Sequence, residues 1–75
     1  MNSSQIDIIN LGEEVRAARR KARLSQDELA ELSGISRRPI YLLESGKGAV
    51  RLNILLRILD ALGLELTIRP RVPKP

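Results

Sequence analysis

The residues best suited to chemistry in this chain are two adjacent arginines, Arg37 and Arg38, followed one helical turn after Arg37 by the sole tyrosine, Tyr41. A guanidinium group can donate two parallel hydrogen bonds, which matches phosphate oxygens and the paired acceptors on the edge of guanine. An isolated Arg-Arg pair usually marks only a solvated basic surface. Residues 25–46, however, predict two short helices joined by a tight turn, with these side chains on the outer face of the second helix. We therefore predict that Arg37, Arg38 and Tyr41 contact DNA bases.

The boundaries of these two helices follow from their capping residues. Ser25 and Glu28 have the spacing of a capping box, in which each side chain accepts a hydrogen bond from the backbone N–H of the other residue. Gly34 can adopt the left-handed conformation that ends a helix. Ser36 is the expected N-cap of the second helix, and Gly46 is its expected end.

This pattern resembles the Xre-type helix-turn-helix domains of phage repressors and Cro proteins, over about residues 11–64. The matching residues are Gln26, Leu29, Ala30, Gly34, Ile35, Ile40, Leu43 and Glu44-Ser45-Gly46-Lys47. The resemblance implies a mainly α, lambda-repressor-like domain with four to five helices that binds double-stranded DNA. It also implies that Ser36 contacts base edges beside Arg37, Arg38 and Tyr41, and that phosphate is contacted by polar residues that flank this group. These are Ser25, Gln26, Ser45 and Lys47.

Arg19 has a different expected role. In Xre-type domains, the arginine six residues before the cap of the second helix pairs with the glutamate that ends the recognition helix. The resemblance therefore implies an ion pair between Arg19 and Glu44, which would join the first predicted helix to the third. Breaking a partly buried pair from one side leaves an unpaired charge, which is costly. We expect Arg19 to be structural and not to contact DNA.

Residues 52–62 carry an apolar pattern broad enough to be buried on more than one side of a helix. The stripe consists of Leu52, Leu55, Leu56, Leu59 and Leu62, with Ile54 and Ile58 as a second apolar line. We expect one side to pack on the other helices and the other side to face a partner. Arg51 and Asn53 are alternative caps for this helix, and Gly63 is its expected end. Leu42 of the preceding helix either packs against this helix or touches a thymine methyl group.

After this helix the pattern changes to the two-residue repeat of a β-strand. The apolar residues Leu64, Leu66 and Ile68 alternate with Glu65, Thr67 and Arg69, and Pro70 ends the pattern. A single strand exposes unpaired backbone groups. We therefore expect residues 64–69 to pair with the same strand of a second copy. The resulting homodimer would present two recognition helices to half-sites about one DNA turn apart.

This ending resembles HipB-like antitoxins, in which the C-terminal strands of two subunits pair. The resemblance is carried by residues 50–64 and by the Leu-Glu-Leu-Thr-Ile segment that follows the helix. It implies a repressor of its own operon that binds a HipA-type kinase toxin. Two alternatives remain open: a stand-alone or phage-type Xre repressor without a toxin, and a protein-interaction module for which DNA binding is incidental.

Length and charge agree with a small DNA-binding protein. The 75 residues suffice for one domain. We divide them into an N-terminal arm (residues 1–7), the helix-turn-helix domain (8–63), the dimerisation strand (64–69) and a tail (70–75). Lysine and arginine number 13 against 9 acidic residues, which gives a net charge of +4. Because the basic residues are clustered, the excess fits a polyanionic partner.

Composition also narrows the remaining function classes. The sequence contains no cysteine and no histidine, so it lacks thiolate metal ligands and the commonest general base. We expect no enzymatic activity, metal, cofactor or small-molecule ligand. No apolar run approaches the ~20 residues needed to cross a bilayer. We expect a cytoplasmic protein that does not associate with membranes.

Overall fold

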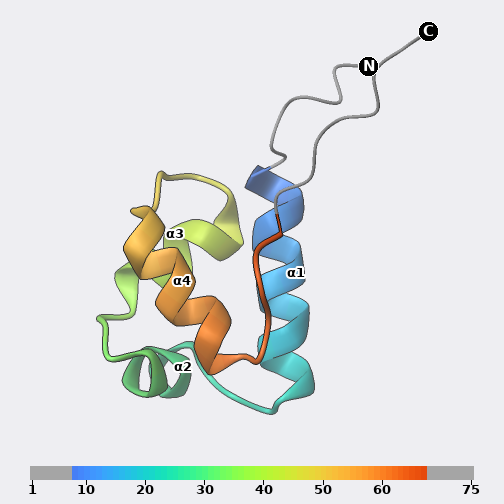
Figure 1. Cartoon of the computed structure of the whole chain (residues 1–75), viewed down its shortest axis with the longest axis vertical. Helices are drawn as coiled ribbons and strands as arrows, with labels where there is room; N and C mark the ends of the chain where they lie inside the picture. The colour runs from blue at the N-terminus through green and yellow to red at the C-terminus, as the bar shows by residue number, and fades with distance from the viewer. Residues whose placement is uncertain (1–7, 68–75) are drawn as a thin grey trace, which may run out of the picture.

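Four α-helices account for most of residues 8–67, the part of the chain that the computed structural model describes. They are α1 (Ile8–Lys21), α2 (Gln26–Ser33), α3 (Arg38–Ser45) and α4 (Leu52–Ala61). In Figure 1, α1 runs along the long axis, α4 lies in front of α3, and α2 lies at the lower end of the molecule. The mainly α architecture predicted from the sequence is confirmed. None of these four helices is long and apolar enough to span a membrane.

The helices share one apolar core to which each contributes a fully buried side chain. These side chains are Val15 of α1, Leu29 of α2, Ile40 of α3 and Ile58 of α4. Burying a side chain of this size stabilises the fold by about 1.5–3 kcal/mol. The short helices α2 and α3 therefore depend on α1 and α4 to cover their apolar faces, which fixes the helix-turn-helix in one arrangement.

The ends of α2 are formed as the sequence predicts. Ser25 Oγ accepts a hydrogen bond from the Glu28 N–H at 3.0 Å, and Glu28 Oε1 accepts one from the Ser25 N–H at 2.7 Å. The bond from the Ser25 N–H, followed by the interaction with the Ser25 side chain, lowers the pKa of the Glu28 carboxyl group. The helix ends at Gly34, which has a left-handed φ of 71°.

The start of α3 differs from the prediction that Ser36 is the N-cap. The N-cap is Arg37, which has helical backbone angles and makes no capping hydrogen bond through its side chain. The first helical hydrogen bond runs from the Tyr41 N–H to the Arg37 carbonyl at 3.0 Å. The shift is compatible with Pro39 in the first turn, because a proline there loses no helical hydrogen bond and already has a helical φ. For α4, Arg51 is the N-cap, and the alternative cap Asn53 is wrong.

The predicted C-terminal strand is not found in the described part of the chain. Gly63 ends α4 with a φ of 71°, as predicted, but residues 64–67 form no strand. A strand needs a neighbour to complete its backbone hydrogen bonds, and residues 8–67 contain no other strand that could pair with it. The remaining residues of the predicted strand, Ile68 and Arg69, lie outside the described residues, as do the predicted arm and tail.

A close contact between α1 and α3 depends on Gly12. This residue is buried, and a Cβ atom placed on it would overlap the carbonyl oxygen of Leu43 and lie 3.3 Å from the Cα of Glu44. The absence of a side chain therefore lets the backbones of α1 and α3 approach each other. The orientation of α3 is set partly by this contact.

Candidate nucleic-acid interface

A buried ion pair holds the C-terminal end of α3. Arg19 donates from Nε to Glu44 Oε2 at 2.7 Å and from Nη2 to Glu44 Oε1 at 3.0 Å. Both residues are only 9% exposed. Arg19 Nη1 also donates to the carbonyl of Leu24 at 2.7 Å. The hydrogen bond to Glu44 raises the pKa of the Arg19 guanidinium group. The structure thus places the two residues that the Xre-type resemblance pairs in direct contact between α1 and α3.

Gln26 extends this network to α2. Its Nε2 donates to Glu44 Oε1 at 3.1 Å, so the carboxylate of Glu44 accepts hydrogen bonds from side chains of two other helices. Gln26 is predicted to contact phosphate, but at least one of its amide hydrogens is used inside the protein. Sequence spacing gives no signal for this second role, because the two residues lie 18 positions apart. Gln26 therefore helps to fix α3 in place.

The predicted base-contacting residues lie on the exposed surface at the start of α3. Ser36, Arg37, Arg38 and Tyr41 are all exposed, and Tyr41 is 45% exposed. Arg37, Arg38 and Tyr41 line one shallow hollow of about 200 Å³. We call these three residues the base-contact surface. The fold thus gathers three of the four predicted residues around one depression that a base edge could approach.

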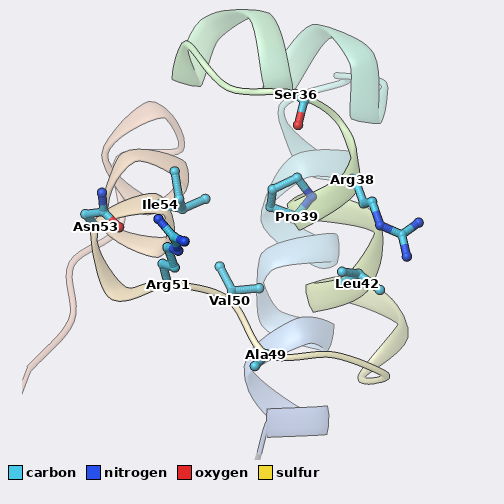
Figure 2. A pocket seen from close by; sticks show the side chains of 9 residues that line it. All are labelled: Ser36, Arg38, Pro39, Leu42, Ala49, Val50, Arg51, Asn53 and Ile54. Carbon is cyan, nitrogen blue, oxygen red and sulfur yellow. The ribbon is translucent and has the colours of Figure 1, made fainter.

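Ser36 borders a second, larger hollow of about 660 Å³ between the start of α3 and the start of α4 (Figure 2). Its lining residues are Ser36, Arg38, Pro39, Leu42, Ala49, Val50, Arg51, Asn53 and Ile54. Arg38 borders both hollows, and its side chain points away from α4 in Figure 2. Arg51 and Asn53 lie across this hollow from Arg38. Sequence reasoning treated these two residues only as helix caps and missed their place beside the candidate interface.

Leu42 packs against the connection between α3 and α4. It is half-buried, and a Cβ atom built on Gly48 would lie 3.1 Å from its Cδ2 atom. It also borders the larger hollow together with Ile54 of α4. The contact with Gly48 shows that Leu42 packs inside the protein, against the connection that leads to α4.

The predicted phosphate contacts lie around the helix-turn-helix. Ser25, Ser45 and Lys47 are exposed, at the start of α2 and at the end of α3. Ser25 Oγ acts as an acceptor inside the protein, so its O–H group can donate outward. Ser45 Oγ donates to the Leu42 carbonyl at 3.1 Å. The Ser45 hydroxyl must therefore leave this hydrogen bond before it can donate to a phosphate.

Two sequence comparisons identify the family. Residues 10–71 match the family model described as a helix-turn-helix domain. The HTH-type transcriptional regulator y4mF of Sinorhizobium fredii is 37% identical over 59 residues, which cover 79% of this chain and 78% of that protein.

Solved structures have a similar fold. The restriction-modification controller protein C.AhdI from Aeromonas hydrophila superposes with a TM-score of 0.72 at 36% identity, covering 79% of this chain and 89% of that one. A chain of the HipA-HipB-O2-O3 complex superposes with a TM-score of 0.76 at 24% identity, covering 88% and 93%, a likeness of fold. This chain therefore belongs to the helix-turn-helix family of DNA-binding transcriptional regulators.

Proposed function

We propose that this protein is a sequence-specific repressor of transcription that inserts α3 into the major groove of double-stranded DNA. The observation that carries the proposal is the placement of Arg37, Arg38 and Tyr41 on one exposed surface of a helix whose other end is anchored. Side chains that discriminate bases must be held in a defined geometry. The network around Glu44 supplies that rigidity.

The proposed contacts divide into two classes. Ser36 and the base-contact surface meet base edges, where an arginine can donate to both O6 and N7 of guanine. The phosphate contacts come from Ser25, Gln26, Ser45 and Lys47. These phosphate contacts set the position of the protein on the duplex and contribute affinity that does not depend on sequence.

We also propose that the protein acts as a homodimer. Leu52 and Leu56 of α4 are 60% and 46% exposed, and Leu64 and Leu66 after it are 38% and 45% exposed. Large exposed apolar side chains favour contact with another protein surface. In the proposed dimer, a second copy covers part of α4, and residues 64–69, including Ile68, pair with the same residues of the partner.

Three finer roles are possible for this protein, and they differ in the partner that it binds. The first is a HipB-like antitoxin that represses its own operon and binds a HipA-type kinase toxin, supported by the similarity of fold to a chain of the HipA-HipB-O2-O3 complex. The second is a repressor without a toxin. It is supported by the higher identity, 36%, to the restriction-modification controller protein. The third is a protein-interaction module for which DNA binding is incidental. In that case, binding to the protein's own promoter should be weak and independent of sequence.

A footprinting experiment tests the proposed function. The purified protein is added to the DNA upstream of its own gene, with and without the product of the neighbouring gene. We expect protection of two half-sites about one helical turn apart, which weakens as salt is raised. A change in the footprint on adding the neighbouring product supports the antitoxin role. Uniform or absent protection contradicts the repressor proposal.

Sedimentation equilibrium tests the dimer separately. Leu56→Glu places a charge on the exposed side of α4 and should yield monomers. Leu32→Glu is the matched control, because Leu32 is also exposed, at 63%, but lies on α2. A monomeric wild-type protein, or equal association of both variants, contradicts the proposed interface.

A further inference from the structure

A carboxylate lies at the edge of the base-contact surface. Asp27, in the first turn of α2, places Oδ1 3.8 Å from Nε of Arg37. The side chains are 77% and 59% exposed, respectively, so both face the solvent from which DNA would approach. A negative charge at this position repels phosphates and lowers affinity for any duplex. The helix dipole favours a carboxylate in this first turn, and beside Arg37 the same carboxylate also acts on the base-contact surface.

We propose that Asp27 is a positioning residue that sets the base specificity of Arg37, an inference that rests on the proposed function. The carboxylate faces Nε, which leaves the two terminal nitrogens, Nη1 and Nη2, to donate to a base. Together these terminal nitrogens match the O6 and N7 acceptors of guanine. The attraction at Nε also favours this orientation of the Arg37 side chain before DNA arrives, so less conformational freedom is lost on binding.

The same carboxylate opposes binding to the wrong sequence. Attraction between arginine and phosphate is independent of sequence and dominates non-specific affinity. Asp27 partly neutralises Arg37 and repels nearby phosphates. Arg37 therefore contributes most to the binding free energy where a guanine edge is available. Discrimination of this kind comes from weakening the competing complexes. Arg38 has no ion pair within residues 8–67, so it serves as a comparison for Arg37, an arginine of the same surface with a carboxylate beside it.

The test compares Asp27→Asn with Glu31→Gln. Both substitutions remove one negative charge from α2, and Glu31 is also exposed. Exposed ion pairs contribute little to folding stability, so both variants should fold. Dissociation constants are measured on the footprinted operator, on a random duplex of equal length, and on operators with each base pair replaced in turn. Asp27→Glu, which keeps the carboxylate, serves as the rescue variant.

For Asp27→Asn we expect the ratio of operator to random affinity to fall by roughly fivefold, the upper end for an exposed charge pair. Preference for guanine at one operator position should also relax, and Asp27→Glu should restore it. Glu31→Gln should tighten binding to both duplexes alike. Equal ratios for Asp27→Asn and Glu31→Gln overturn this inference alone. A wild-type protein that does not distinguish operator from random duplex overturns the proposed function, and this inference with it.

Discussion

Arg19 on α1 and Glu44 on α3 face each other through two hydrogen bonds of 2.7 and 3.0 Å, which join guanidinium nitrogens to both carboxylate oxygens. The pair fixes α3 at the end opposite to the base-contact surface. Both residues are only 9% exposed, so water cannot replace these hydrogen bonds unless α1 and α3 move apart. The proposed recognition helix is therefore anchored by residues that stay inside the protein.

Arg19→Ala should lower the free energy of unfolding by about 3–5 kcal/mol, because it leaves the buried Glu44 carboxylate without its cation. Urea denaturation measures this change. Arg20→Ala is the control, since Arg20 is the exposed neighbour and its loss should cost within about 0.5 kcal/mol. If Arg19→Ala kept wild-type stability and lost only DNA binding, Arg19 would be a DNA contact and its structural assignment would be wrong.

Gly12→Ala tests the close approach of α1 and α3. Two effects of this substitution change the free energy of unfolding in opposite directions. Alanine favours an exposed helix over glycine by roughly 1 kcal/mol. At Gly12, however, the added Cβ meets the backbone carbonyl of Leu43, which cannot rotate away. We expect a net loss of about 1–3 kcal/mol, typical of overpacking. Thermal or urea unfolding shows whether the variant is less or more stable, and a stabilised variant would show that the steric cost at Leu43 is smaller than the helical preference of alanine.

Ser33→Ala should stabilise the protein by about 1 kcal/mol. Ser33 is 8% exposed, and within residues 8–67 its hydroxyl oxygen has no hydrogen-bond partner. A buried hydroxyl without a partner carries a desolvation cost that alanine removes. Alanine also favours the helical conformation at this last residue of α2. Urea denaturation of the two proteins measures the difference, and a destabilised variant would indicate a partner for the hydroxyl in solution.

The helix-turn-helix could be predicted from sequence because its signals are local. The capping box at Ser25 and the left-handed glycine at Gly34 each depend on residues a few positions apart. The Arg19–Glu44 contact links residues 25 positions apart, and only the resemblance to Xre-type domains supplied it. No spacing rule reveals the contact between Gly12 and Leu43, because it depends on how the packed helices cross.

The differences between the prediction and the structure also have physical reasons. Ser36 is a better N-cap than Arg37 by residue type, but the helix starts one residue later, with Pro39 in its first turn. Alternation at residues 64–67 predicted a strand, yet alternation records only which side chains share a face. Strand formation also needs a second backbone to complete the hydrogen bonds. The roles of Gln26 and Asp27 beside α3 depend on side-chain contacts that a linear pattern does not contain.

The most direct test of the central claim compares Arg38→Ala with Lys47→Ala in binding to the operator and to a random duplex over a range of salt concentrations. We expect Arg38→Ala to weaken operator binding by about 1–3 kcal/mol and random binding far less. Lys47→Ala should weaken binding to both duplexes alike. It should also lower the slope of log affinity against log salt concentration by the amount expected for about one phosphate contact. Equal loss on both duplexes for Arg38→Ala would contradict the claim that the base-contact surface of α3 discriminates DNA sequence.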